Sequence, residues 1–384
     1  MNYRIFGKTG KKVSVLGFGC MRLPVLDKDN GKVDMAEISR MFHYAIDQGV
    51  NYFDTAYTYH EGNGEEAVAK ALEGHRSKVY VATKLPVWNV QKHEDMESLL
   101  DEQLRRLKTD VIDFYLVHAL NRTYWKKLVD LDLLEFLYRI KKKGKVQHLG
   151  FSFHDDYEQF VTIMDSFPWE FCQIQYNYLD ENYQAGTQGL KYAHQKGLGI
   201  AIMEPLRGGT LVNKLLPEVQ KLIDKVSGLN PAELALKWIW NHPEIAVVLS
   251  GMTEMANVVD NIRYSQDSEK PLLPEERKLI SQIQQLYRQK AKVDCTACKY
   301  CMPCPSGVDI PQCFEYYNQA MMFEDVKRAR FWYNRIGKAS NCTECGNCEE
   351  YCPQNIKIID TLKEVRELLE TEDEAESPAA ENRS

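Results

Sequence analysis

VYVATK (79–84) is followed by DMESLLDEQLRRL (95–107) and then by VIDFYLVH (111–118). The first and third segments are short apolar runs rich in β-branched and aromatic residues, which predict buried strands. The middle segment predicts a helix whose apolar face is formed by Leu99, Leu100, Leu104 and Leu107. A strand, a helix and a second strand in succession imply parallel strands joined by a crossover helix. This unit predicts the α/β class.

The same alternation continues along the chain. Eight segments predict strands: Val13–Gly19, Val50–Asp54, Val79–Lys84, Val111–His118, Val146–Ser152, Phe171–Tyr176, Leu198–Met203 and Ile245–Ser250. Helices are expected between them, among others at Met35–Gln48, Asp95–Leu107, Leu131–Lys143, Asp155–Met164 and Pro231–Trp240. Eight such units favour a closed (β/α)8 TIM barrel, which we assign to residues 1–288. The segment Tyr3–Lys12 is expected to form a hairpin that caps the bottom of the barrel.

Eight of the eleven cysteines form two runs late in the sequence, each followed by a proline. They are Cys295, Cys298, Cys301 and Cys304, then Cys342, Cys345, Cys348 and Cys352. Three cysteines at every third position and a fourth before a proline form the spacing that binds a 4Fe–4S cluster. Disulfides are not expected in a chain that opens without an apolar signal segment. Zinc is the main alternative, but it has no use for a third equally spaced cysteine.

In ferredoxins with two clusters, the fourth cysteine of each run binds the cluster of the other run. We therefore expect two clusters, one on Cys295, Cys298, Cys301 and Cys352, the other on Cys342, Cys345, Cys348 and Cys304. The segment Pro311–Ile336 between the runs predicts one or two helices. Residues 289–365 are thus expected to form a small, mostly α-helical, ferredoxin-like 4Fe–4S domain.

The composition narrows the class of protein. The 384 residues are 44% hydrophobic and carry a net charge of −7, which allows a large core and gives no basic field for nucleic acid or an anionic membrane. No apolar stretch is long enough to span a bilayer. We expect a cytoplasmic protein. The acidic end, 366–384, lacks apolar periodicity and predicts a disordered tail.

Four polar residues stand where predicted strands end, which is where the active sites of such barrels lie. Asp54, Lys84 and His118 close the second, third and fourth strands, and Tyr59 follows in the loop after Asp54. With these residues in this order, the sequence resembles the aldo/keto reductase family. FDTAYTY (53–59) is similar to that family's Asp-x-Ala-x-x-Tyr signature. Other similar segments are TK (83–84), DFYLVH (113–118), GKV (144–146), GFS (150–152), QYN (175–177) and 231–238.

The resemblance implies that these four residues reduce a carbonyl, or oxidise an alcohol, by hydride transfer. Tyr59 would donate the proton when a carbonyl accepts hydride. Lys84 would lower the pKa of Tyr59 by favouring its phenolate, and Asp54 would fix the Lys84 ammonium. His118 would donate a hydrogen bond to the substrate carbonyl. A buried lysine needs such a partner, because burying an unpaired charge is costly.

The resemblance also implies a nicotinamide nucleotide. Ser152 and Gln175 match the residues that hold its carboxamide. Met203 stands where an aromatic residue usually stacks on the nicotinamide ring. Asp260 and Asn261 match contacts to the adenine.

The choice between NAD and NADP stays open at this point. Gly251 and Asn257 stand where basic residues usually bind the 2′-phosphate of NADP, and no arginine or lysine lies from Leu249 to Asn261. Arg207 and Arg263 could supply that charge instead.

Three functions are compatible with a hydride-type site and iron–sulfur clusters, which carry one electron each. The first is an NAD(P)H-dependent reductase whose clusters stabilise it or connect it to a redox partner protein such as a ferredoxin. The second is a ferredoxin-linked reductase whose clusters feed a flavin or the substrate directly. The third is a non-catalytic redox sensor or electron-transfer adaptor. The intact set of four residues favours the first. Trp88, Tyr124 and Trp125 are expected to line an apolar mouth for a small-molecule substrate.

Overall fold

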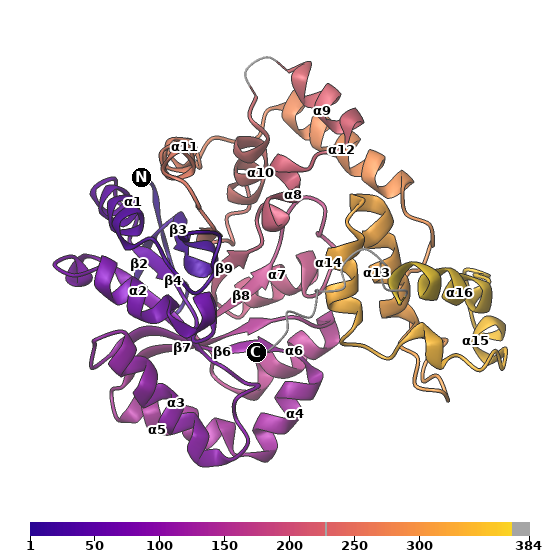
Figure 1. The fold of residues 1–384 in the computed structure, drawn as a ribbon, viewed down its shortest axis with the longest axis horizontal. Helices are drawn as coiled ribbons and strands as arrows, with labels where there is room; N and C mark the ends of the chain where they lie inside the picture. Colours follow the sequence, from indigo (N-terminus) through magenta and orange to yellow (C-terminus); the bar gives the residue numbers. More distant parts are fainter. Residues whose placement is uncertain (227–228, 371–384) are drawn as a thin grey trace, which may run out of the picture. The chain divides into compact units, whose positions relative to one another are not determined.

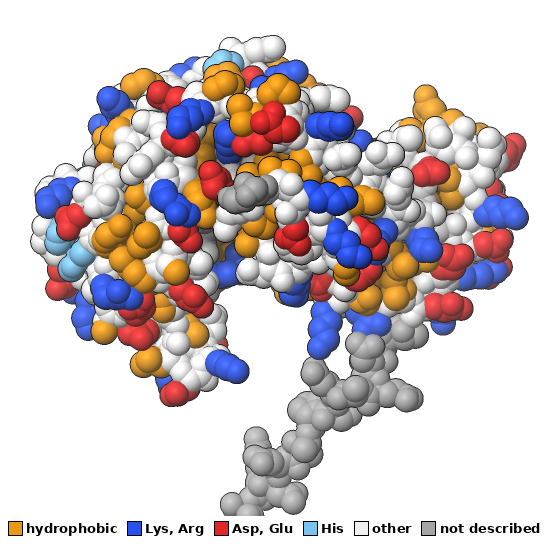
Figure 2. Space-filling view, turned by 90° about the horizontal axis from the view of Figure 1, so that it is seen from above, with side chains coloured by type: hydrophobic (Ala, Val, Ile, Leu, Met, Phe, Trp, Pro, Cys, Tyr) orange, Lys and Arg blue, Asp and Glu red, His pale blue; other side chains and the backbone are white. Residues whose placement is uncertain are grey.

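The computed structural model describes residues 1–226 and 229–370, which form two compact units. Of the described residues, the first unit comprises 1–215, 223–226 and 229–278, and the second comprises 216–222 and 279–370. In 1–226 and 229–370, no helix combines the length and the apolar character needed to cross a bilayer. Lys and Arg side chains are interspersed with Asp and Glu over the face seen in Figure 2.

Eight parallel strands close into a barrel in the first unit, as the sequence predicts (Figure 1). Around the barrel they are β3 (Leu16–Gly19), β4 (Tyr52–Asp54), β5 (Tyr80–Leu85), β6 (Ile112–Leu120), β7 (Val146–Phe153), β8 (Phe171–Gln175), β9 (Gly199–Met203) and β10 (Val247–Ser250). Strand β10 pairs with β3 and closes the ring. The first predicted strand is in fact divided, because only Leu16–Gly19 enters the barrel.

A hairpin covers the amino-terminal end of the barrel. Strand β1 (Tyr3–Ile5) pairs antiparallel with β2 (Lys12–Ser14), which contains the start of the segment predicted as the first barrel strand. Beyond β1, the Phe6 ring is fully buried, with its centroid 5.2 Å from those of Phe114 and Phe171. The predicted cap at the bottom of the barrel is therefore confirmed, and it leaves the carboxyl ends of the strands for a site.

Helices follow the barrel strands and cover the outside of the sheet (Figure 1). They are α1 (Met35–Asp47), α2 (Gly64–Ala71), α3 (His93–Arg106), α4 (Arg122–Asp130), α5 (Leu133–Lys142), α6 (Tyr157–Ser166), α7 (Gly186–Gln195), α8 (Thr210–Asn213), α10 (Pro231–Trp240) and α11 (Met255–Ser265). Helix α9 (Pro217–Asp224) belongs mostly to the second unit, and α12 (Pro274–Gln289) passes from the first unit into the second. Helix α10 has the predicted bounds. The buried face of α3 is rotated from the expected one, because Gln103 is buried and Leu99 and Leu104 are only partly buried.

The second unit is helical around the cysteine runs. It contains α13 (Ile310–Phe323), α14 (Val326–Tyr333), α15 (Asn347–Glu350) and α16 (Ile358–Leu369). The first two occupy the segment in which one or two helices were expected. Its core includes Phe314, Tyr333, Leu362 and Val365.

The predicted tail, 366–384, begins too early. Residues 366–369 belong to α16, and Leu369 is buried in the core of the second unit. The amphipathic pattern of α16 therefore continues into the acidic end of the chain. The remainder of the predicted tail, 371–384, lies outside the described residues.

Candidate active site and cysteine pockets

A buried ion pair stands at the carboxyl end of the barrel. Lys84 on β5 donates from Nζ to Oδ1 of Asp54, the last residue of the adjacent β4, over 2.7 Å. The side chains are only 1% and 4% exposed. Nζ also donates to the backbone oxygen of Thr55, over 2.7 Å. The ammonium thus has two fixed acceptors inside the barrel mouth.

Each charge of this pair favours the ionised form of the other group. Burial alone would lower the pKa of Lys84, but the Asp54 carboxylate and Tyr59 together hold that pKa above its usual value. Burial raises the pKa of Asp54, and the Lys84 ammonium opposes this rise. Lys84 is therefore charged throughout the physiological pH range.

Tyr59 opens the short 3-10 turn η2 (Tyr59–Gly62), and Lys84 Nζ lies 5.1 Å from the centroid of its ring. Burial raises the pKa of Tyr59, and although the Lys84 charge counteracts this effect, the pKa stays above its usual value. The expected net lowering by Lys84 is therefore wrong, because withdrawal from water outweighs the charge. At neutral pH the Tyr59 phenol keeps its proton.

His118 on β6 completes the group. Its ring centroid lies 6.3 Å from that of Tyr59 and 4.9 Å from that of Trp88, which adds an aromatic side chain beside the site. Burial, and then the charges of Lys84 and His154, hold the pKa of His118 well below its usual value. Among the described residues, nothing hydrogen-bonds the buried Nδ1 of this neutral imidazole. The structure thus brings the four predicted residues together at one barrel end.

The residues expected around the nicotinamide end occupy neighbouring strands. Ser152 lies on β7, Gln175 ends β8 and Met203 ends β9. Ser152 Oγ accepts a hydrogen bond from the amide of Ala119 over 2.7 Å. Gln175 Nε2 donates to Asp180 Oδ2 over 2.8 Å. Both polar side chains are therefore held in place by the protein itself.

The residues expected at the adenosine end lie in α11 and in the loop between β10 and α11. Gly251 and Asn257 are exposed, whereas Asn261 is buried and donates to Ser250 Oγ over 2.9 Å. Asp260 forms an ion pair with Arg263 over 3.1 Å. Asn261 is thus a buried residue that ties α11 to the end of β10, whereas the other three residues are exposed or partly exposed.

The two arginines considered as compensating charges both have acidic partners. Arg263 pairs with Asp260, and Arg207 Nε lies 3.4 Å from Asp180 Oδ2. Arg207 is 3% exposed. Each guanidinium is therefore already paired with a carboxylate of the protein.

Sequence reasoning missed a second buried polar group behind β5. Glu65 on α2 and Gln103 on α3 are fully buried and hydrogen-bonded to each other over 2.7 Å. The available signal was Gln103 at helical spacing from Met96 and Leu100, on the face that proves to be buried. A single glutamine beside apolar residues of a helix is easily taken to lie at the solvent-exposed border of the buried face.

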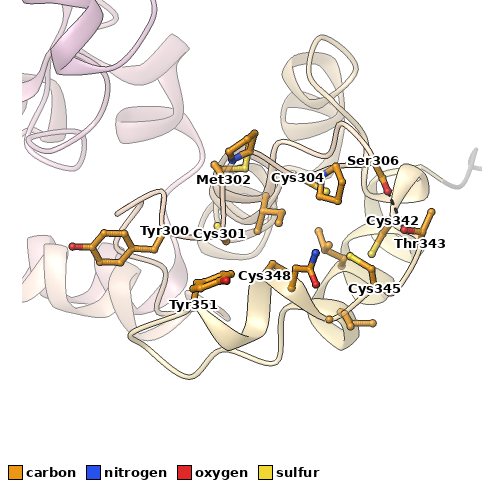
Figure 3. Close-up of a pocket in the computed structure, with 17 residues that line it drawn as sticks. Tyr300, Cys301, Met302, Cys304, Ser306, Cys342, Thr343, Cys345, Cys348 and Tyr351 are labelled. Carbon is orange, nitrogen blue, oxygen red and sulfur yellow. Dashed lines mark hydrogen bonds between the residues drawn. The ribbon is translucent and has the colours of Figure 1, made fainter.

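The cysteines of the two runs line two pockets in the second unit. One pocket is lined by Cys295, Cys298, Cys301 and Cys352. The other is lined by Cys301, Cys304, Cys342, Cys345 and Cys348, and Figure 3 shows Cys304 across the pocket from residues of the second run. Each pocket is therefore lined by cysteines of both runs, and Cys301 lines both pockets. Cys20, Cys172 and Cys313 are buried free thiols.

The donor set suits a cluster. Each pocket gathers at least four sulfur donors, and thiolates are the ligands of iron–sulfur clusters. Burial raises the pKa of Cys295, and the neighbouring Cys298 and Cys352 raise it further. In 1–226 and 229–370, no three or more His, Cys, Asp or Glu side chains converge closely enough to hold a single metal ion. A cluster is wider than one ion and keeps its thiolates further apart.

Comparison with known proteins agrees with this division of the chain. The model of the aldo/keto reductase family matches residues 15–287, and a model described as a 4Fe-4S dicluster domain matches residues 294–356. L-galactose dehydrogenase of Arabidopsis thaliana is 26% identical over 285 residues, which cover 67% of this chain and 86% of that protein.

Solved structures show the same barrel. An aldo-keto reductase from Bacillus halodurans, in its holo form, is 25% identical with a TM-score of 0.62 and covers 74% of this chain and 96% of its own. An aldo-keto reductase from Klebsiella pneumoniae in complex with NADPH is 22% identical, with a TM-score of 0.60, and covers 74% of this chain and 95% of its own. At that identity the second likeness concerns the fold.

Proposed function

The chain belongs to the aldo/keto reductase family and carries a 4Fe-4S domain, and from this premise we propose that it reduces a small-molecule carbonyl, or oxidises the corresponding alcohol, with NADH or NADPH. The observation that carries the proposal is the buried Lys84–Asp54 ion pair beside Tyr59. A buried charged pair contributes little net stability, so its presence at a strand end is better explained by chemistry.

Tyr59 is the proton donor in this proposal. A bound nicotinamide would supply the hydride to the carbonyl carbon. The Tyr59 hydroxyl, protonated at neutral pH, gives its proton to the carbonyl oxygen as negative charge develops there. The Lys84 ammonium stabilises the phenolate that remains, and Asp54 keeps Lys84 in position.

His118 orients the substrate. Its neutral imidazole can donate one hydrogen bond to the carbonyl oxygen, and no other described group competes for its Nδ1. Trp88 packs beside it, which gives the site an apolar side and excludes water. An aldehyde or ketone with an apolar substituent fits these surroundings.

The nucleotide would lie across the carboxyl ends of the strands. Ser152, Gln175 and Met203 would hold its nicotinamide end. Gly251, Asn257, Asp260 and Asn261 would lie at its adenosine end. The NADPH of the Klebsiella relative makes NADPH one candidate, and the missing basic residues at Gly251 and Asn257 keep NADH as the other.

The second unit would hold two 4Fe–4S clusters. We assign the first to Cys295, Cys298, Cys301 and Cys352, and the second to Cys342, Cys345, Cys348 and Cys304. This assignment is supported by the two pockets, each of which is lined by cysteines of both runs.

A redox partner protein is a second element of the proposal. Cys298 and Cys345 are exposed, so one edge of each assigned cluster would face solvent. A one-electron carrier such as a ferredoxin could exchange electrons there.

Replacing Tyr59 by phenylalanine tests the proposed chemistry. Protein purified without oxygen is assayed for NADH and NADPH oxidation with aldehydes and ketones, after iron, sulfide and flavin have been measured. Tyr59→Phe should abolish turnover, whereas Tyr57→Phe should preserve it, because it retains the ring that stacks on Arg106. Unchanged turnover in Tyr59→Phe would refute the assignment.

A further inference from the structure

A buried hydrogen-bond network lies behind β5, on the side away from the site. The Glu65 side chain is 0% exposed, and its Oε1 accepts from Thr83 Oγ1 over 2.6 Å and from Gln103 Nε2 over 2.7 Å. Gln103 is also fully buried, and its Oε1 accepts from the Tyr115 hydroxyl over 2.9 Å. The network thus joins α2, α3, β5 and β6 by side chains that are withdrawn from water.

This network is attached to the backbone of the catalytic lysine. Gln103 Nε2 lies 3.0 Å from the carbonyl oxygen of Lys84, to which it donates. Thr83 precedes Lys84 on β5, and adjacent strand residues point to opposite faces, so Thr83 faces the helices while Lys84 faces the barrel mouth. Fixing Thr83 and the Lys84 carbonyl therefore fixes the direction in which the Lys84 side chain leaves the strand.

The same network reaches Tyr59 through the start of α2. Glu65 is the second residue of that helix, which begins directly after the turn that contains Tyr59. The contact between helix and turn is close: a Cβ atom on Gly64 would lie 2.9 Å from Cβ of Tyr59. A shift of the first turn of α2 would therefore move Tyr59.

We infer that Glu65 is a positioning residue for the reaction: it holds Lys84, through Thr83 and Gln103, and the Tyr59 turn, through α2, in one geometry. This inference rests on the proposed reductase activity and adds to it a carboxylate that touches neither substrate nor nucleotide. Burying a carboxylate is unfavourable unless donors satisfy it, and burial raises the pKa of Glu65. Two side-chain donors serve its Oε1, whereas Oε2 lies 3.6 Å from Arg106 Nη1 and has no hydrogen-bond partner among the described residues. The arrangement is the rigid support that a proton-transfer pair requires.

The variants Glu65→Gln and Glu65→Met test whether the hydrogen bonds accepted by Glu65, rather than the space that its side chain fills, support turnover. Glu65→Gln keeps an oxygen that can accept from Thr83 and Gln103, so its turnover should stay close to that of the unchanged protein. Glu65→Met removes the acceptor, and we expect kcat to fall about 10- to 100-fold, the range for a small misplacement of reacting groups, with KM unchanged. Glu66→Met is the matched control, since Glu66 is the next residue on α2 and is exposed.

If Glu65→Met does not fold, the less disruptive variant Thr83→Val provides the test. Thr83→Val removes one donor and preserves the shape of the side chain, so kcat should fall by a smaller factor, again without a change in KM. The inference is overturned if Glu65→Met or Thr83→Val keeps the original kcat, or if kcat falls only in proportion to the folded fraction seen by circular dichroism.

A crystal structure of Glu65→Met, or of Thr83→Val if needed, gives a readout independent of turnover. We expect the 2.7 Å contact between Lys84 Nζ and Asp54 Oδ1 to lengthen or to be replaced. An unchanged contact would contradict the positioning role. If the unchanged protein reduces no carbonyl, the proposed function fails, and this crystal structure still decides whether Glu65 positions Lys84.

Discussion

Lys84 Nζ lies 2.7 Å from Asp54 Oδ1 where two adjacent barrel strands end, and both side chains are almost completely withdrawn from solvent. The pair is coupled, because each charge offsets the cost of burying the other. Its value for function follows from its position beside Tyr59, because the Lys84 ammonium can stabilise the Tyr59 phenolate that remains after proton transfer.

Replacing Lys84 by methionine should therefore damage both stability and turnover. The Asp54 carboxylate would be left buried without its partner, and we expect a loss of about 3–5 kcal/mol in the free energy of unfolding. Denaturant unfolding and steady-state turnover measure the two effects. The double variant Asp54→Asn with Lys84→Met should regain most of the stability and none of the turnover. Equal stability of Lys84→Met and the unchanged protein would contradict a buried ion pair.

The pH dependence of the two reaction directions should differ. Because burial raises the pKa of Tyr59, the phenol needed for carbonyl reduction is present at neutral pH and is lost only above the usual tyrosine value of about 10. Alcohol oxidation needs the phenolate, so its rate should rise with pH over the same range. Rates at saturating substrate in both directions provide the test. A decline of reduction near neutral pH would show that a different group donates the proton.

Acid stability should depend on Glu170 at the base of the barrel. Burial alone would raise the pKa of Glu170, but hydrogen bonds from His148, Lys141 and the Leu149 amide lower it to about 2. The stabilisation from this carboxylate is thus complete above the usual glutamate value of about 4.3 and is lost as pH falls toward about 2.

Thermal unfolding as a function of pH measures this contribution. Glu170→Gln should lower Tm at neutral pH and flatten its decline in acid. The exposed control Glu94→Gln should reproduce the original curve. If Tm of Glu170→Gln declines in acid as steeply as that of the unchanged protein, other carboxylates determine the acid stability.

Single cysteine variants should separate the two proposed clusters by their crossed ligands. Cys352→Ser should remove the same cluster as Cys295→Ser, although the two cysteines belong to different runs. Combining these two should cost no further iron, whereas combining Cys352→Ser with Cys342→Ser should remove both clusters. Iron and sulfide analysis with electron paramagnetic resonance of the reduced protein distinguishes these cases, and Cys172→Ala in the barrel is the control. Loss of separate clusters from Cys352→Ser and Cys295→Ser would refute the crossed assignment.

Much of the fold could be predicted from local patterns. Each barrel strand is a short apolar run, because its two faces meet the barrel interior and a covering helix, and such runs are visible in the sequence. The boundary inside Val13–Gly19 was hidden, since no proline or glycine separates Val13 of the hairpin strand from Leu16 of the barrel strand. The helix at 358–369 was hidden by the acidic residues that surround its apolar positions.

The residues that form the site could be predicted from the sequence, but the pKa shifts of these residues could not. Asp54, Lys84 and His118 are recognisable because each stands at or near the end of a strand. The direction of the Tyr59 pKa shift depends on how much water the loops exclude, which no spacing reveals. The Glu65–Gln103 contact joins residues 38 positions apart, so only the folded chain brings its partners into view.

The central claim is that hydride, rather than electrons from the clusters, reduces the carbonyl at Tyr59. The most direct measurement follows deuterium from nicotinamide labelled on its transferable position into the product alcohol, by mass spectrometry, with cluster-loaded protein under anaerobic conditions. We predict that the product of the unchanged protein carries one deuterium on the former carbonyl carbon and that Tyr59→Phe forms almost none. A product that carries only solvent hydrogen at that carbon, formed equally well by Tyr59→Phe, would contradict the account.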